Sequence, residues 1–218
     1  MSKLCTIIGM GPGVSLSIAR RFAKEGFTVA MVARNEDKLK QFQVQLNEEG
    51  LEGHGFIGDA ANFDSLRSAF GQIHKQLGET HVLVYNVSVF REATPTELDA
   101  EICVEDFRAN VGGAIVAVQQ VVDDMKAQGE GVIFLTGGGQ GLEPYPSFSS
   151  LAIGKSAMRS LAFSLHGDLK NSGICVSTVT INGVVDPTTK FAPNLICEAF
   201  WKLYESRENE MPREVIYE

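Results

Sequence analysis

Short apolar runs alternate with longer amphipathic segments along almost the whole chain, and this alternation constrains the fold more than any other feature. The apolar runs are rich in β-branched residues, which is typical of buried strands; they cover residues 4–8, 28–33, 55–57, 82–85, 132–136, 174–180 and 215–217. The segments with helical spacing cover residues 15–25, 35–50, 62–78, 105–128, 149–171 and 195–206. This order predicts a doubly wound α/β domain, with a parallel sheet of about seven strands and helices on both faces.

The length and composition fit one such domain. The chain has 218 residues, of which 44% are hydrophobic and 21% are charged. A chain of this size can bury a core without the help of disulfide bonds or a structural metal. No proline- or serine-rich linker, low-complexity tract or internal repeat divides it, and residues 1–218 are predicted to form a single domain. The net charge of −8 comes without a basic stripe, which argues against a nucleic-acid partner.

The cysteines and histidines indicate neither a disulfide framework nor a metal site. Cys5, Cys103, Cys175 and Cys197 stand far apart, and the four histidines have no metal-ligand spacing. The first apolar run, residues 4–8, is too short for a signal peptide or a membrane span. We therefore expect a cytoplasmic protein with reduced thiols, no bound metal and no membrane partner.

A glycine-rich turn joins the first strand to the first helix. Glycines at such a junction let the backbone approach a pyrophosphate, which then sits at the positive N-terminus of the helix. A valine stands where the common Gly-x-Gly-x-x-Gly pattern has its third glycine, so the turn also fits a purely structural role. Its place in the predicted sheet favours a nucleotide and a Rossmann-like domain. The predicted binding residues of this turn are Gly9, Gly11, Pro12, Gly13 and Val14.

The end of the second strand indicates which nucleotide is bound. NAD sites commonly place an acidic residue about 20 residues after the glycines, where it binds the ribose hydroxyls. Here the chain reads Ala33-Arg34-Asn35. A guanidinium can bind a 2′-phosphate bidentately, although an arginine at a strand end can also be simply solvated. NADP(H) is the predicted cofactor in preference to NAD(H), with Arg34 as a binding residue.

The chain resembles the short-chain dehydrogenase/reductase family along nearly its whole length. The family's glycine pattern is Gly-x-x-x-Gly-x-Gly; Gly9 and Gly13 match its first two positions, and Ser15 replaces the third. Two further segments, residues 59–60 and 83–88, resemble positions that contact the cofactor in this family. The resemblance therefore implies that Asp59, Ala60, Asn86 and Val87 contact the cofactor.

The second half of the chain carries the rest of the resemblance. Asn110 lies in a segment similar to the one that supplies a catalytic asparagine, and Lys155 matches the lysine that binds the nicotinamide ribose. Val185 and Thr188 lie near the expected contacts to the nicotinamide carboxamide. The resemblance therefore implies catalytic roles for Asn110 and Lys155, and cofactor contacts for Lys155, Val185 and Thr188.

Two catalytic side chains of the family are absent. The family has a tyrosine four residues before its lysine, where the ammonium lowers the pKa of the phenol; here that residue is Leu151. The catalytic serine, expected 13 residues earlier, is replaced by Gly138. The glycine run around that position could offer backbone N–H groups to an oxyanion or simply permit a tight turn.

Tyr145 is the remaining candidate for an acid near these positions. It has the right chemistry if its loop folds inward, although it does not have the helical spacing to Lys155. The serines between Tyr145 and Leu151 are better explained as caps or loop hydrogen bonders.

The combined interpretation is an NADP(H)-dependent oxidoreductase that acts on a small carbonyl or alcohol substrate. A protein that binds NADP(H) without catalysis, as a sensor or scaffold, is the alternative, because both catalytic hydroxyls are missing. The resemblance also implies a homodimer or homotetramer. Ala157, Leu161 and Leu165 could supply its interface, or the same stripe could face the sheet.

Overall fold

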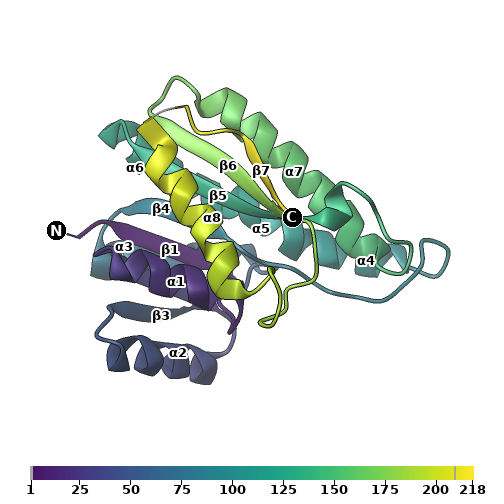
Figure 1. Ribbon diagram of the computed structural model, residues 1–218, viewed down its shortest axis with the longest axis horizontal. Helices are drawn as coiled ribbons and strands as arrows, with labels where there is room; N and C mark the ends of the chain where they lie inside the picture. Colours follow the sequence, from purple (N-terminus) through teal and green to yellow (C-terminus); the bar gives the residue numbers. More distant parts are fainter. Residues whose placement is uncertain (1, 209) are drawn as a thin grey trace.

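A seven-stranded parallel sheet forms the centre of the molecule (Figure 1). The computed structural model describes residues 2–208 and 210–218. The strands are β1 (Leu4–Ile8), β2 (Thr28–Ala33), β3 (Gly53–Ile57), β4 (Thr80–Tyr85), β5 (Gly131–Gly138), β6 (Ile174–Ile181) and β7 (Glu214–Tyr217). They lie in the order β3-β2-β1-β4-β5-β6-β7, and every neighbouring pair is parallel. The predicted doubly wound sheet is confirmed.

Helices cover both faces of this sheet, as the sequence predicts (Figure 1). One face carries α1 (Val14–Lys24), α2 (Glu36–Glu48) and α8 (Pro193–Glu205). The other face carries α3 (Phe63–Leu77), α5 (Gly113–Gln119), α6 (Val122–Gln128) and α7 (Ser149–Leu169). The side chains of Asn35 and Asn62 cap α2 and α3 by accepting hydrogen bonds from the backbone N–H groups of Lys38 and Ser65.

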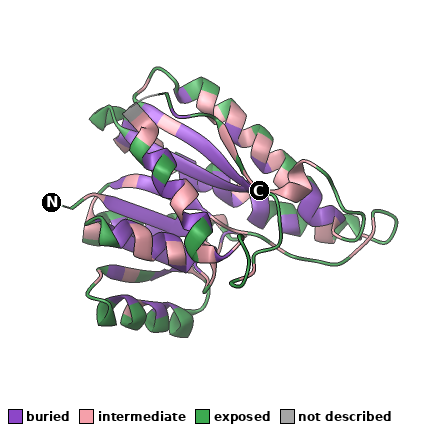
Figure 2. Ribbon diagram, viewed as in Figure 1, coloured by how far each residue is buried: buried purple, intermediate pink, exposed green. Residues whose placement is uncertain are grey.

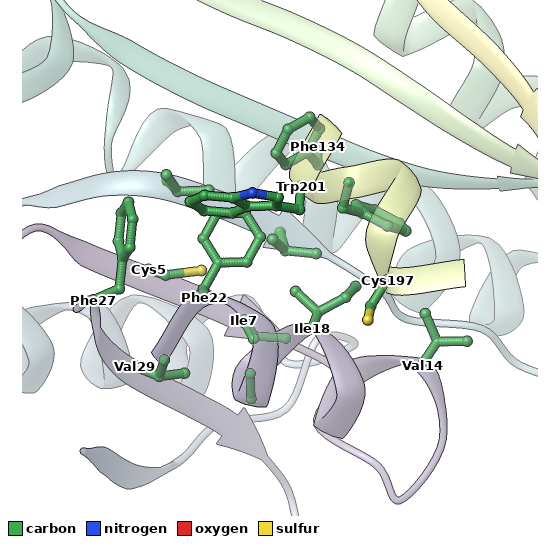
Figure 3. Close-up of a cluster of buried hydrophobic side chains, with 14 of the residues drawn as sticks. Cys5, Ile7, Val14, Ile18, Phe22, Phe27, Val29, Phe134, Cys197 and Trp201 are labelled. Carbon is green, nitrogen blue, oxygen red and sulfur yellow. The ribbon is translucent and has the colours of Figure 1, made fainter. Parts of the chain in front are cut away.

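The strands are buried from both sides, which explains their nearly continuous apolar sequence (Figure 2). On the face of α1 and α8, the rings of Phe22, Phe27, Trp201 and Tyr204 meet mostly edge to face, with centroids 5.2–6.4 Å apart. Figure 3 shows Phe22 and Trp201 at the centre of this cluster. Burial of such rings stabilises the fold, and truncation of one to alanine typically costs about 3–5 kcal/mol.

The prediction of one continuous helix over residues 105–128 is wrong. The segment begins earlier, at α4 (Ala100–Phe107), because the Asp99 side chain accepts from the N–H groups of Glu101 and Ile102. A π-helical turn, Arg108–Gly112, then separates α4 from α5. The carbonyl of Ala109 in this turn accepts a hydrogen bond from the buried hydroxyl of Tyr85, which competes with regular helical pairing.

The carboxyl ends of all the strands lie along one edge of the sheet because the strands are parallel (Figure 1). The strand order reverses between β1 and β4, so the connections that leave these two strands run in opposite directions. In open α/β sheets, ligands bind in the crevice outside such a reversal. The topology therefore places a candidate site where β1 and β4 end.

Candidate active site

Two cavities lie side by side along the carboxyl edge of the sheet and share Asn86 and Ser88 in their walls. The first cavity has a volume of about 430 Å³ and lies beyond β1, β2 and β4; its walls include Gly9, Arg34, Asp59, Ala60, Asn86 and Val87. The second cavity has a volume of about 620 Å³ and lies beyond β4, β5 and β6; its walls include Val14, Tyr145, Lys155 and Val185. The fold thus brings together most of the residues that the sequence predicts.

The glycine turn leaves open space in front of helix α1. Gly9 has φ +88°, and a Cβ there would lie 2.6 Å from the carbonyl oxygen of Asn86, so only glycine fits. Gly11 and Gly13, in contrast, have no heavy atom within 4 Å of an added Cβ. No side chain caps α1 and its first turn carries no acid. The N-terminus of α1 is therefore available to an anion.

Ser15, which replaces the family's third glycine, connects the turn to β4. Its hydroxyl donates to the carbonyl of Gly9 at 2.8 Å and accepts from Asn86 Nδ2 at 2.6 Å. Ser15 itself is buried, and its partners Gly9 and Asn86 are partly buried. The serine that departs from the family pattern therefore links the glycine turn to the end of β4. The sequence does not reveal it, because Ser15 and Asn86 are 71 residues apart.

The first cavity has an unpaired cation at its rim. Arg34 is exposed, and no described acid forms an ion pair with it. Asp59 lines the same cavity, where its Oδ1 accepts from the N–H of Ala61. A free guanidinium beside a small residue, Ala33, can bind a phosphate.

An ion pair between an exposed arginine and a buried aspartate, which sequence reasoning missed, lies at the far side of the first cavity. Arg91 donates to both carboxylate oxygens of Asp106, at 3.0 and 3.1 Å, and Ser150 donates to the same carboxylate. Burial alone would raise the pKa of Asp106, but the hydrogen bonds from Arg91 and Ser150 lower it overall. The pair ties the β4–α4 connection to α7, and the spacing of these residues in the sequence gives no sign of it.

Lys155 extends from α7 into the second cavity. Its Nζ donates to the carbonyl oxygen of Thr136, at 2.9 Å, near the end of β5. Burial lowers the pKa of Lys155 from 10.5 to about 8, because desolvation disfavours the ammonium. No other partner of Nζ lies among the described residues, so the group has further donors to offer.

Asn110 lies in the π-helical turn against α7. Its Oδ1 accepts from the backbone N–H of Val89 at 2.8 Å, and so holds the segment after β4 in place. Its Nδ2 is buried and has no hydrogen-bond partner among the described residues. Gly154 makes this approach possible, because a Cβ there would lie 2.9 Å from that Nδ2. An unpaired buried donor beside Gly154, the residue that precedes Lys155, marks a place where a polar ligand or water can bind.

The glycine run at the end of β5 and in the turn that follows allows close packing. A Cβ on Gly137 would lie 2.5 Å from the Thr180 hydroxyl, and one on Gly139 would lie 2.4 Å from the Asn182 side chain. Gly141 approaches the backbone of Lys155 in the same way. Gly138 differs, because a Cβ there would only touch the Lys155 stem, at 3.4–3.6 Å. The fold therefore has room for a serine at 138, and its absence is not imposed by crowding.

The walls of the second cavity are mainly apolar. The rings of Phe90 and Phe148 are tilted by 38° with their centroids 4.4 Å apart, and Leu151 is buried in the same wall. Tyr145 also lines the cavity but is 61% exposed, and its backbone N–H donates to the Gln140 side chain. Sequence reasoning missed the two phenylalanines, since only the loop packing brings them together.

Of the two predicted contact residues in the segment after β6, one lies in a cavity wall. Val185 lines the second cavity, whereas Thr188 belongs to neither cavity wall. The amide and hydroxyl of Thr188 both donate to Asp186 Oδ1, which closes a local turn. Pro12 also lies outside both walls, within the glycine turn.

The comparisons with known proteins agree with this geometry. The family model for short chain dehydrogenases matches residues 3–194. The chain belongs to the short-chain dehydrogenase family. Oxidoreductase asL5 of Sarocladium schorii is 26% identical over 211 residues, which cover 97% of this chain and 82% of that protein. Acetoacetyl-CoA reductase of Cupriavidus necator is 27% identical over 178 residues, which cover 79% of this chain and 70% of the reductase.

Solved structures with the same fold include two NADP complexes. A gluconate 5-dehydrogenase from Burkholderia cenocepacia, in complex with NADP and tartrate, superposes with a TM-score of 0.87 at 21% identity, covering 99% of this chain and 94% of that one. A metagenomic short-chain oxidoreductase in complex with NADP gives a TM-score of 0.90 at 20% identity, covering 98% and 95%. These likenesses establish the architecture of this short-chain dehydrogenase.

Two kinds of site are absent from the described part of the chain. Residues 2–208 and 210–218 contain no cluster of three or more histidine, cysteine or acidic side chains that could hold a metal. Over the same ranges, no helix has the length and apolar character that a membrane crossing needs.

Proposed function

We propose that this short-chain dehydrogenase is an NADP(H)-dependent oxidoreductase that acts on a small carbonyl or alcohol substrate. One observation carries the proposal: the two adjoining cavities lie at the reversal of strand order, with a free guanidinium in one and Lys155 in the other. The first cavity fits the adenosine half of a dinucleotide, and the second fits the nicotinamide and the substrate.

The residues present fit the cofactor. The open space at Gly11 and Gly13 leaves room for the pyrophosphate at the N-terminus of α1. Arg34 would bind the 2′-phosphate, and Asp59 with Ala60 would contact the adenine. Asn86, Val87, Val185 and Thr188 complete the proposed contacts. The two NADP complexes among the similar structures support this choice over NAD(H).

Of the proposed catalytic residues, Lys155 and Tyr145 lie in the wall of the second cavity, whereas Asn110 lies in neither wall and packs against Gly154 of α7. Lys155 would bind the nicotinamide ribose, and Asn110 would hold an ordered water close to it. When bound, the cofactor supplies or accepts a hydride. The proton would come from Tyr145, from water or from a group on the substrate, since Leu151 has none to give.

A second function is favoured by the missing hydroxyls. Leu151 is buried and apolar, and Gly138 lacks a side chain although the fold has room for one. Loss of a positioned general acid typically costs about 10²–10⁴-fold in rate. The alternative proposal is therefore a sensor or scaffold that binds NADP(H) without turning it over.

Titration with NADPH and NADH, followed by cofactor fluorescence, tests binding. A carbonyl panel assayed with the wild type and with the double variant Gly138→Ser/Leu151→Tyr tests chemistry. Turnover by the wild type supports the oxidoreductase, whereas turnover by the double variant alone supports the sensor. Tighter binding of NADH than of NADPH would contradict the role of Arg34.

We also propose a homodimer or homotetramer. Ile115 on α5 and Ile153 on α7 are 41% and 47% exposed, whereas the predicted interface residues Leu161 and Leu165 are partly buried against the core. Sedimentation velocity tests this: a mass of at least twice the 23.7 kDa chain is expected, and a monomer would refute it.

A further inference from the structure

The proposed reaction needs a proton donor. The side chain of Lys155 lies in the wall of the second cavity and can serve as one. We propose that Lys155 itself gives the proton to the carbonyl oxygen of the substrate, in place of the missing tyrosine. This inference rests on the proposed function, because it requires a carbonyl substrate beside the bound cofactor.

The position of the Lys155 ammonium is suited to this role. One of its three N–H bonds points to the carbonyl of Thr136, which anchors Nζ at the end of β5. No described residue accepts from the other two, and Lys155 lines the second cavity. An anchored ammonium with free donors can meet a substrate oxygen directly or through one water.

No carboxylate near Lys155 competes for its proton. On α4, Asp106 is engaged by Arg91 and Ser150. On β7, Glu214 is held by Arg159 of α7 and by Thr180 of β6. These acids are already paired.

The strands and turns packed against Lys155 add no further charge. The residues of β5 and of the turn Gly139–Gly141 include no titratable group, and β6 carries only Cys175, at its opposite end. Tyr145 is the other titratable side chain in the cavity wall. Desolvation is accordingly the one cause of the shift in the pKa of Lys155.

This desolvation makes the ammonium a useful acid near neutral pH. Burial lowers the pKa of Lys155 to about 8, and a general acid works best when its pKa lies near the working pH. An unperturbed phenol has a pKa of about 10, so the family's tyrosine needs a neighbouring cation to become comparably acidic. Burial alone brings the pKa of Lys155 into that range, without a neighbouring cation.

The two departures from the family pattern favour this arrangement. Leu151 lies one helical turn before Lys155 and is 7% exposed, so it presents apolar surface where a phenol would stand. Gly138 itself places no side chain against Cε and Cδ of Lys155, where a Cβ would lie 3.4 and 3.5 Å away.

The proton balance of the step is simple. In the reductive direction, the carbonyl carbon receives the hydride that the cofactor supplies, and the π electron pair of the C=O bond moves to oxygen. That oxygen takes a proton from Nζ of Lys155, which leaves an alcohol and a neutral amine. Water then returns a proton to the amine. In the oxidative direction, the neutral amine accepts the proton of the alcohol.

The first experiment measures the acidity of Lys155 without cofactor or substrate. The wild type is labelled with trinitrobenzenesulfonate at a series of pH values, and the rate at each lysine is read by peptide mass spectrometry. We expect the rate at Lys155 to rise with a midpoint near pH 8. Lys40 is the internal control, because its hydrogen bond to Glu36 raises its pKa above the ordinary value. A midpoint for Lys155 at pH 10 or above would overturn the proposal.

The second experiment separates proton donation from ribose binding. Lys155→Arg keeps a cation that can hold a ribose, but an arginine does not release its proton at these pH values. We expect kcat for reduction to fall about 10²–10⁴-fold, with the Kd for NADPH changed by less than about tenfold. Lys40→Arg is the matched control. Lys155→Ala, assayed with added primary amines, provides a second variant, and rescue that follows amine acidity is expected.

The outcomes distinguish this inference from the proposed function. Absence of NADPH binding, or of turnover by the wild type, would refute the oxidoreductase itself. If the wild type turns over and Lys155→Arg retains its kcat, the donor role alone is overturned. Loss of turnover in Tyr145→Phe together with its retention in Lys155→Arg would assign the proton to Tyr145. In wild type, kcat for reduction should fall tenfold per pH unit above about pH 8, because the ammonium is the required form.

Discussion

Replacement of Arg34 by glutamine should abolish the preference for NADPH without weakening the fold. Arg34 is exposed and has no ion-pair partner among the described residues, so its removal leaves no buried charge behind. The free energy of unfolding should therefore change by no more than about 0.5 kcal/mol, as for other surface substitutions.

The exposure of Arg34 also sets how much its replacement should weaken NADPH binding. A hydrogen bond to a charged group contributes about 1.5–3 kcal/mol, and solvent at the rim of the first cavity keeps the contribution near the lower end. The Kd for NADPH should therefore rise about 10- to 30-fold, while the Kd for NADH, which lacks the 2′-phosphate, should stay the same.

Fluorescence titration of both nucleotides against the wild type and Arg34→Gln measures these changes, and Arg67→Gln on α3 is a matched control, since its guanidinium is paired with Asp64. Salt should weaken NADPH binding by the wild type more than by the variant. An unchanged Kd for NADPH in Arg34→Gln, or an equal loss for both nucleotides, would refute the assignment of the 2′-phosphate to this residue.

Three further predictions concern the scaffold of the site. Gly9→Ala should lower the free energy of unfolding by about 2–4 kcal/mol in urea titrations, because it adds left-handed strain and an overlap with the Asn86 carbonyl; an unchanged midpoint would show that the turn can relax. Ser15→Ala should cost about 1 kcal/mol, since it leaves two partly buried polar groups without their partner, and Ser17→Ala, two residues further along α1, serves as a control. The folded-state pKa of Asp106 is lowered, so its contribution to stability is present above its unfolded pKa and is lost as the pH falls through the folded value. Urea unfolding below about pH 4 should accordingly be less pH-dependent in Asp106→Asn than in the wild type, and equal slopes would contradict the ion pair with Arg91.

Much of the fold could be predicted from local sequence. Alternating apolar runs identify the strands, and Asn35 and Asn62 mark helix starts by the chemistry of their side chains. The break in the helix expected over residues 105–128 could not be predicted in this way. The carbonyl of Ala109 in its π-helical turn accepts from the hydroxyl of Tyr85, which lies on a strand and 24 residues away along the chain. Helical spacing contains no information about such a contact.

Some features of the candidate site could likewise be read from the sequence, whereas others required the tertiary structure. The sequence by itself singled out the glycine turn and Arg34, because both depend on spacing within one strand–helix–strand unit, and its resemblance to the family singled out Lys155. Only the tertiary structure decided that Ser15 bonds Asn86 and that the stem of Lys155 lies beside Gly138. The acidity of Lys155 belongs to this second group. It comes from desolvation by segments distant in sequence, and how completely they exclude water depends on packing that no local pattern specifies.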